Sequence, residues 1–242
     1  MGRKARLPKS SAEPVSRKLT AMQWDETPAQ RRHRATKILA ALRTEFPGAQ
    51  TALHHQNPFQ LLIATILSAQ CTDERVNMVT PGLFRRYPGP EHFAAANQVE
   101  LEQEIRSTGF FRMKTRNIMA CSSAIVERHE GEVPRVMEEL VALPGVGRKT
   151  ANVVLGQAFG VAAGVVVDTH VHRLAQRLGF SSAQNPGEIE KDLMEVFPQE
   201  NWIEVGRSLI LHGRKTCVAR NPRCPVCLVH ELCPSAGLFT SR

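Results

Sequence analysis

Residues 143–152 read Leu-Pro-Gly-Val-Gly-Arg-Lys-Thr-Ala-Asn and are the most informative segment of the chain about its fold. Pro144 ends one helix, because its ring removes a backbone donor and obstructs the preceding turn. Gly145 and Gly147 permit tight backbone geometry and a close approach of the main chain to a ligand. Val146 can pack inward between the two helices, and the second helix begins near Gly147. The segment therefore predicts a hairpin between two consecutive helices.

The second helix of this hairpin offers a site for a phosphate group. Its free N–H groups and the positive end of its dipole suit an anion, and Gly145, Gly147 and Arg148 are the candidate contacts. An ordinary corner between helices would also contain Pro and Gly. Lys149 lies in the first turn, where the helix dipole and the neighbouring Arg148 both disfavour an ammonium. A neutral amine there could act as a nucleophile and form a Schiff base, although Lys149 could equally be another phosphate contact.

A second polar element follows at residues 165–173, Val-Val-Val-Asp-Thr-His-Val-His-Arg. The apolar run delivers Asp168 to the start of a helix, where its carboxylate could simply be a cap. Alternatively, Asp168 and Lys149 each stand at a helix start and could face a common cleft. Such a pair supplies a nucleophile and a group that stabilises positive charge. His170 and His172 are interpreted as phosphate or structural contacts.

Four cysteines near the C-terminus form a candidate metal centre with the spacing C-x6-C-x2-C-x5-C, at Cys217, Cys224, Cys227 and Cys233. Four thiolates satisfy tetrahedral zinc, and the same ligand set holds a 4Fe–4S cluster, so the spacing leaves both open. Disulfides are disfavoured because no secretory signal opens the chain. Cys71 and Cys121 lie in apolar helical segments and are interpreted as buried core residues. The basic residues around the four cysteines favour a structural centre beside nucleic acid.

The rest of the chain predicts an all-α protein. Its 242 residues are 42% hydrophobic and carry a net charge of +8. Thr27, Asn57 and Asn185 each precede a proline, which is the pattern of a helix N-cap. Helices are expected at about 58–69, 73–86, 98–107, 111–129, 136–142, 148–159, 169–178 and 202–213. The β-like run 165–167 is too short for a sheet, and no apolar run reaches membrane-spanning length.

The N-terminal segment carries most of the charge. Residues 1–37 hold ten Lys or Arg against three acidic residues, which leaves about +1 for the remainder. We interpret residues 1–27 as a flexible basic arm that binds nucleic acid. A solvated tail or an organelle-targeting segment is the alternative.

The hairpin at 143–152, Val-Asp-Thr-His at 167–170 and the four-cysteine spacing together resemble endonuclease III, a family of helix–hairpin–helix DNA glycosylases with an iron–sulfur cluster. The likeness runs from about residue 30 to 234. It implies two all-α domains with DNA in the groove between them. Residues 51–162 would form a six-helix barrel. Residues 28–50 with 163–234 would form the iron–sulfur cluster domain, followed by a tail at 235–242.

The same resemblance implies roles for individual residues. Lys149 would be the nucleophile and Asp168 its catalytic partner, and the cysteines would bind 4Fe–4S rather than zinc. Gln70, in the matching segment 67–73, would enter the space left by an extruded base. Phe110 falls where the family places an apolar wedge that is usually aliphatic. A further departure is the spacing of Lys149 and Asp168: eighteen residues separate them, one more than in the common bacterial pattern.

The resemblance implies the activity of a base-excision repair enzyme, a bifunctional DNA glycosylase and abasic-site lyase for damaged, oxidised pyrimidines. Its partner would be duplex DNA with damaged bases or abasic sites, and we expect a monomer in the bacterial cytoplasm, associated with the nucleoid and with no membrane contact. An adenine-mismatch glycosylase would lack the nucleophilic lysine. A noncatalytic DNA-binding module would be inactive on an abasic duplex.

Overall fold

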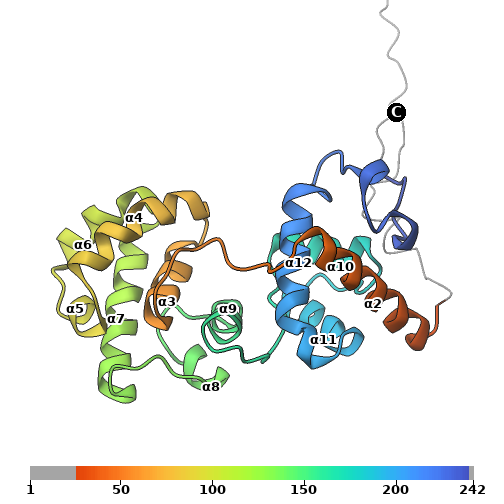
Figure 1. Ribbon diagram of the computed structural model, residues 1–242. Coiled ribbons are helices and arrows are strands. Elements are labelled where there is room, and N and C mark those ends of the chain that lie inside the picture. Colours follow the sequence, from red (N-terminus) through yellow and green to blue (C-terminus); the bar gives the residue numbers. More distant parts are fainter. Residues whose placement is uncertain (1–25, 240–242) are drawn as a thin grey trace, which may run out of the picture.

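The computed structural model describes residues 26–239, and over that range the chain forms helices and no strand (Figure 1). The predicted all-α fold is confirmed. The α-helices are α2 (Pro28–Glu45), α3 (Pro58–Leu67), α4 (Asp73–Arg86), α5 (Pro90–Ala94), α6 (Gln98–Ile105), α7 (Phe111–His129), α8 (Met137–Val141), α9 (Arg148–Ala158), α10 (Thr169–Arg177), α11 (Pro186–Val196) and α12 (Trp202–Lys215). Four short 3₁₀ helices accompany them: η1 (Arg106–Thr108), η2 (Gln199–Asn201), η3 (Cys224–Val226) and η4 (His230–Leu232).

Three helices begin where an N-cap followed by proline predicted them. Thr27 forms a capping box with Gln30 at the start of α2. The Asn57 side chain accepts from the backbone of Gln60 at 2.9 Å, and that of Asn185 accepts from Gly187 at 2.8 Å. Each cap satisfies backbone donors that have no partner inside the helix. The starts of α2, α3 and α11 are therefore fixed by neighbours in the sequence.

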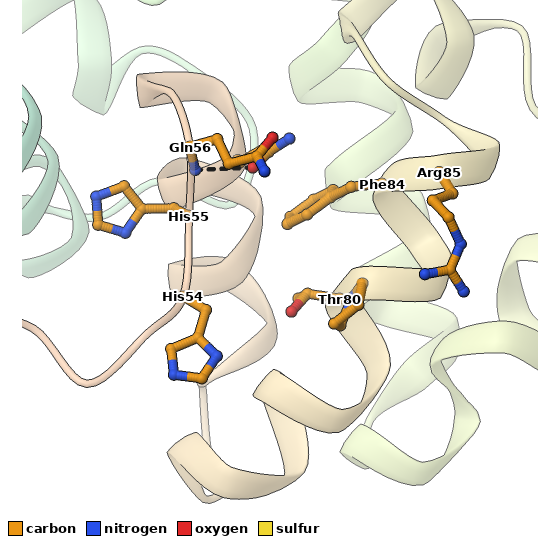
Figure 2. Close-up of a pocket in the computed structure, with 8 residues that line it drawn as sticks. His54, His55, Gln56, Thr80, Phe84 and Arg85 are labelled. Carbon is orange, nitrogen blue, oxygen red and sulfur yellow. Dashed lines mark hydrogen bonds between the residues drawn. The ribbon is translucent and has the colours of Figure 1, made fainter.

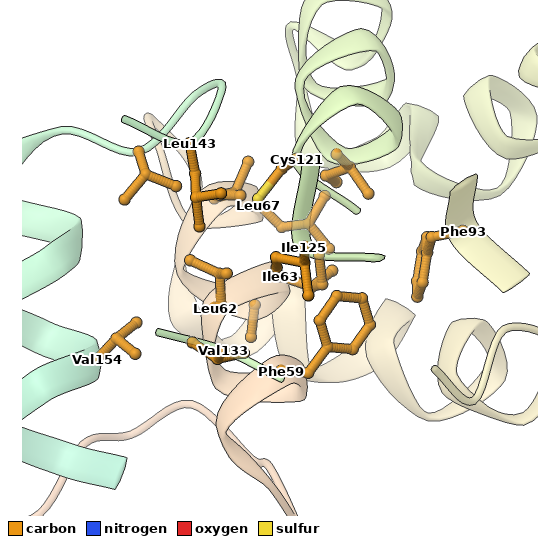
Figure 3. Close-up of a cluster of buried hydrophobic side chains, with 14 of the residues drawn as sticks. Phe59, Leu62, Ile63, Leu67, Phe93, Cys121, Ile125, Val133, Leu143 and Val154 are labelled. Atoms are coloured by element: carbon orange, nitrogen blue, oxygen red, sulfur yellow. The ribbon is translucent and has the colours of Figure 1, made fainter. Parts of the chain in front are cut away.

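The first hydrophobic core lies among α3 to α9 and is centred on α3 (Figure 3). Leu62, Ile63 and Leu67 of α3 are fully buried, and they pack with apolar residues of α7 and α9. Cys121 of α7 is buried in this core as predicted, whereas Cys71 is only half-buried beside it. Because α3 is apolar on nearly all sides, it can only stand at the middle of a group of helices.

The second hydrophobic core joins α2 to the C-terminal part of the chain. Ile38 and Leu42 of α2 are buried against apolar residues of α10, α11 and α12. In Figure 1 these four helices form a separate group beside α3–α9, and two connecting segments pass between the groups. The two cores have no residue in common. We propose that they are two domains, formed by residues 51–162 and by residues 28–50 with 163–234.

Some local details differ from the expectations. The short helix α5 was not expected, because five residues are too few to show a helical period. Helix α12 continues two residues beyond the expected end, to Lys215. Most of the predicted basic arm, residues 1–27, and the last three residues of the tail lie outside the described residues. Within residues 26–239, no helix is both long and apolar enough to cross a membrane.

Candidate active site and nucleic-acid interface

The structure places Lys149 and Asp168 on one pocket between the two groups of helices. The pocket has a volume of about 140 Å³. Lys149 comes from the first turn of α9, and Asp168 from the start of α10. Residues of α3, α4 and α12 complete the walls, together with the segment 50–53 that connects the two groups. The two side chains predicted to face a common cleft therefore do so.

Lys149 is exposed and has a free amine. Helix α9 has Gly147 as its N-cap, and no side chain caps the helix. The donors of its first turn are therefore open to a ligand. Among residues 26–239, Lys149 forms neither a side-chain hydrogen bond nor an ion pair. Nothing in the described structure holds its amine away from the pocket.

Asp168 is both a helix cap and a pocket residue. Its Oδ1 accepts from the backbone N–H of His170 at 2.8 Å and of Val171 at 2.9 Å. Its Oδ2 has no hydrogen-bond partner in the described part of the chain. The two roles considered from the sequence are thus compatible, because capping fixes the carboxylate through one oxygen and leaves the other free for chemistry.

Glu190 of α11 holds the helix that carries Lys149. Its carboxylate accepts from Arg148 Nε at 2.7 Å, from Arg148 Nη2 at 3.0 Å and from Asn152 Nδ2 at 2.8 Å. Arg148 and Asn152 lie one turn apart on α9, and Lys149 lies between them in the sequence. Glu190 is only 5% exposed. The paired carboxylate raises the pKa of the Arg148 guanidinium. Sequence reasoning missed this contact and assigned Arg148 to a phosphate.

The linker from α9 to α10 passes directly over this contact. A Cβ atom on Gly164 would lie 2.0 Å from Glu190 Oε1 and 2.9 Å from the Asn152 side-chain amide. A Cβ at that distance would force Glu190 or the linker to shift, so glycine is strongly favoured here. The linker then continues through the buried Val165 and Val167 to Asp168. One set of contacts thus fixes both the start of α9 and the path to Asp168.

Two arginines of α12 connect the groups of helices across the pocket. Arg214 Nη1 pairs with Asp73 Oδ2 at 2.8 Å, which joins α12 to the start of α4. Arg207 donates to the carbonyl oxygen of Ala49 at 3.3 Å and to that of Gly156 at 3.2 Å. Burial lowers the pKa of Arg207. Both arginines line the pocket, and their charge suits a phosphate-bearing ligand.

Gln70 and Phe110, the residues predicted to enter DNA, share an uncommon backbone conformation. Both are exposed, Phe110 by 58%. Both have a positive φ, 53° for Gln70 and 47° for Phe110. Residues other than glycine adopt this region only where the surrounding structure imposes it. Such positions cluster at ligand contacts, which agrees with a functional role for both side chains.

The hairpin itself is closed by a bond from the Val146 backbone N–H to the Leu143 carbonyl at 3.1 Å. Val146 is buried between the helices as expected. Gly145 has a φ of 77° and lies against Asn117, whose Cβ would be 2.7 Å from a Cβ at this position. Gly145 and Gly147 are exposed, and their backbone is accessible to a ligand. His170 is half-buried, and its Nδ1 contacts Arg173 Nη2 at 3.2 Å.

The four cysteines lie in the loop after α12, and α10 holds this loop in place. Arg177 donates to Cys217 Sγ at 3.3 Å and to the carbonyl of Val218 at 2.8 Å. Arg173, one turn earlier, donates to the carbonyl of Cys217 at 3.0 Å and to that of Gly213 at 2.8 Å. Asp168 is the N-cap of α10, so one helix joins the cysteine loop to the pocket.

The cysteine side chains have a common environment. All four are half-buried. Negative charge on Cys217, Cys224 or Cys227 would add to the effect of burial and raise the pKa of the Cys233 thiol. Burial raises the pKa of the Cys233 thiol to about 11 and also raises that of Cys227. Such thiols become thiolates only when a cation compensates for the burial. Within residues 26–239, no three His, Cys, Asp or Glu side chains are grouped to hold a single metal ion.

A second cavity of about 360 Å³ lies elsewhere in the first helical group and shares no residue with the Lys149 pocket. Figure 2 shows Thr80 and Phe84 of α4 across from the segment that carries His54, His55 and Gln56. His55 Nδ1 lies 2.9 Å from the Leu53 carbonyl. None of the residues predicted to act on DNA lines this cavity.

The class of protein follows from a comparison with known families. The model of HhH-GPD superfamily base excision DNA repair proteins matches residues 63–199, a span that contains the hairpin and both Lys149 and Asp168. The chain therefore belongs to this superfamily of base excision DNA repair proteins.

Individual relatives narrow the class further. The chain is 56% identical over 208 residues to an endonuclease III of Synechocystis sp., covering 86% of this chain and 95% of the relative. It is 50% identical over 189 residues to an endonuclease III of Bacillus subtilis, covering 78% of this chain and 86% of the relative. A solved structure titled as a trapped endonuclease III–DNA covalent intermediate matches with a TM-score of 0.80 and 46% identity, covering 85% of this chain and 96% of that chain. The chain belongs to the endonuclease III family of the HhH-GPD superfamily, as the three motifs predicted.

Proposed function

We propose that this protein removes damaged bases from duplex DNA and then cleaves the strand at the abasic site. One observation carries the proposal: Lys149 and Asp168 line the same pocket, one with a free amine and the other with a free carboxylate oxygen. The related structure, a trapped covalent endonuclease III–DNA intermediate, supports a covalent step. By its likeness to endonuclease III, we propose oxidised pyrimidines as the substrates.

The reaction begins with the extrusion of the damaged nucleotide, because its C1′ atom is shielded inside the duplex. Unstacking costs about a few kcal/mol. Gln70 and Phe110 offset this cost by filling the gap, as inserted side chains do in other minor-groove proteins. The exposed backbone of Gly145 and Gly147, with the positive end of α9, would bind a phosphate of the strand. His170 would contact a neighbouring phosphate at the start of α10.

The chemical steps use the two pocket residues. The Asp168 carboxylate, with Oδ2 free, stabilises the positive charge that develops on the sugar as the bond from C1′ to the base weakens. It can then accept the proton that the Lys149 nitrogen loses when it bonds to C1′. The Lys149 amine forms a bond to C1′, and the bond from C1′ to the base breaks, so that the base leaves with the electron pair and is protonated. Opening of the sugar gives a Schiff base between Lys149 and C1′. Loss of a proton from C2′ then expels the 3′ phosphate, and water releases Lys149.

The cysteine centre would hold a 4Fe–4S cluster. The possible ligands are four cysteine sulfurs on one loop. Arg177 donates to the sulfur of Cys217, and a hydrogen bond of this kind is typical of a thiolate that binds a metal. When bound, the cluster would supply a cross-link within the loop and no step of base removal. Arg173 and Arg177 attach the loop to α10, so a formed loop would support the position of Asp168. The basic residues of the loop would lie beside the DNA backbone.

Borohydride trapping on an abasic-site duplex tests the proposal, because it captures the Schiff base. Lys149→Gln should abolish the trapped complex while duplex binding stays nearly unchanged, since only one of many cations is lost. Lys191→Gln, an exposed lysine of α11, is the matched control and should trap normally. Normal trapping by Lys149→Gln would show that a different amine reacts. A protein that neither traps the abasic duplex nor removes a damaged base would be a noncatalytic DNA-binding module.

A further inference from the structure

Lys114, in the first turn of α7, is buried in an unusual way for a lysine. Its side chain is 2% exposed. Its ammonium donates to the carbonyl oxygen of Leu67 at 2.7 Å and to that of Thr108, also at 2.7 Å. No acidic side chain of residues 26–239 forms an ion pair with it. Lysine is rarely fully buried unless it is paired, so the two carbonyls must compensate for its charge.

The two carbonyls belong to the ends of two different helices. Leu67 is the last residue of α3, and Thr108 is the last residue of η1. The final carbonyls of a helix have no partner within it and carry the negative end of the helix dipole. One ammonium therefore caps two helix ends that are 41 positions apart in the sequence.

Each of these helix ends leads directly into a residue proposed to enter DNA. Gln70 follows Leu67 by three positions, and Phe110 follows Thr108 by two. The first loop is closed by the bond from the Cys71 N–H to the Ser68 carbonyl at 3.1 Å. Both Gln70 and Phe110 have a positive φ, which persists only where neighbouring structure holds the backbone. Lys114 is the side chain that bonds to the base of both loops.

We propose that Lys114 is a positioning residue that joins the two loops, so that Gln70 and Phe110 enter the duplex as one unit with a fixed spacing. This inference rests on the proposed function of Gln70 and Phe110. Lys114 itself is too deeply buried to contact DNA. Its role is to keep the ends of α3 and η1 together while the two exposed side chains separate the bases.

A double-mutant cycle measures this joining. The probe is a duplex with one tetrahydrofuran site, which binds like an abasic site but forms no Schiff base. With Lys114 present, Gln70→Ala and Phe110→Ala should each weaken binding. The fold-change in Kd of the double variant should differ from the product of the two single fold-changes by about tenfold, as is typical of coupled residues. With Lys114→Met, the same cycle should show coupling of less than about twofold. Lys114→Met by itself should not change the affinity for undamaged duplex.

Two further variants keep the test decisive. Cys121→Ala removes a buried side chain from the same helix, two turns further on, without touching either loop, and should retain the coupling. Lys114→Gln keeps a polar group but is one atom too short to reach both carbonyls. If circular dichroism shows that Lys114→Met does not fold, Lys114→Gln takes its place in the cycle. The coupling between Gln70 and Phe110 should be lost in Lys114→Gln as well.

The outcomes separate this inference from the function on which it rests. Unchanged coupling in the Lys114 variants, or no coupling with Lys114 present although both single substitutions weaken binding, would overturn the positioning role. If Gln70→Ala and Phe110→Ala leave the preference for the tetrahydrofuran duplex intact, it is the proposed insertion of these side chains that fails.

Discussion

Replacing Glu190 with glutamine tests whether its contact with α9 positions Lys149. Glutamine has nearly the same shape but no charge. Its amide nitrogen can occupy the place of Oε1, since Asn152 can turn its own amide and present Oδ1, which has no partner at present. Arg148 Nη2 then loses its acceptor, while Arg148 Nε keeps one. The variant therefore loses one charge-assisted hydrogen bond and the attraction of the ion pair.

The structure sets the size of this effect. A hydrogen bond to a charged group contributes roughly 1.5–3 kcal/mol, and breaking a fully buried ion pair costs roughly 3–5 kcal/mol. The Arg148 side chain is 51% exposed, so water will solvate it and the lower range applies. We expect Glu190→Gln to lower the free energy of unfolding by about 2 kcal/mol. A displacement of Lys149 approaching 1 Å should slow base removal by about tenfold to a hundredfold.

Urea denaturation and single-turnover base removal at saturating enzyme measure the two quantities separately. Glu188→Gln is the control, because Glu188 lies on the same helix and carries the same charge but is exposed. In an Arg148→Met background, Glu190→Gln should lower the free energy of unfolding much less, since the main partner of Glu190 is already absent. If Glu190→Gln behaves like Glu188→Gln in both assays, the contact of Glu190 with α9 does not position Lys149.

The remaining predictions concern the pocket, the linker and the cysteine loop. Asp168→Asn should leave the urea midpoint nearly unchanged, because asparagine caps equally well, but should slow base removal by about a hundredfold or more; full activity would make Asp168 only a cap. Gly164→Ala should destabilise the fold by about 1–3 kcal/mol through its clash with Glu190, whereas Gly82→Ala, with its nearest neighbour at 4.0 Å, should be neutral or slightly stabilising in the same urea titration. Cys224→Ser should lower both the iron content of the purified protein and its affinity for duplex DNA; stoichiometric zinc without iron in anaerobically prepared native protein would contradict the cluster.

Features that depend only on neighbouring residues could be predicted from the amino-acid sequence. The caps at Thr27, Asn57 and Asn185 act within three residues of the helix that each begins. The hairpin is formed by a proline and two glycines within four positions. Order and spacing of the hairpin, Asp168 and the cysteines were enough to indicate the family. These are short-range properties, and the chain adopts them wherever the segment is placed.

Which charged groups contact one another depends on how the helices pack. Glu188 and Glu190 are alike in the sequence, yet one is exposed and the other is buried against Arg148, 42 positions away. Lys114 lies among other basic residues of α7, and only the packing of α3 and η1 against its helix shows what its ammonium contacts. The partner of a long side chain is set by how helices dock, and docking depends on the whole core. No local pattern of residues encodes it.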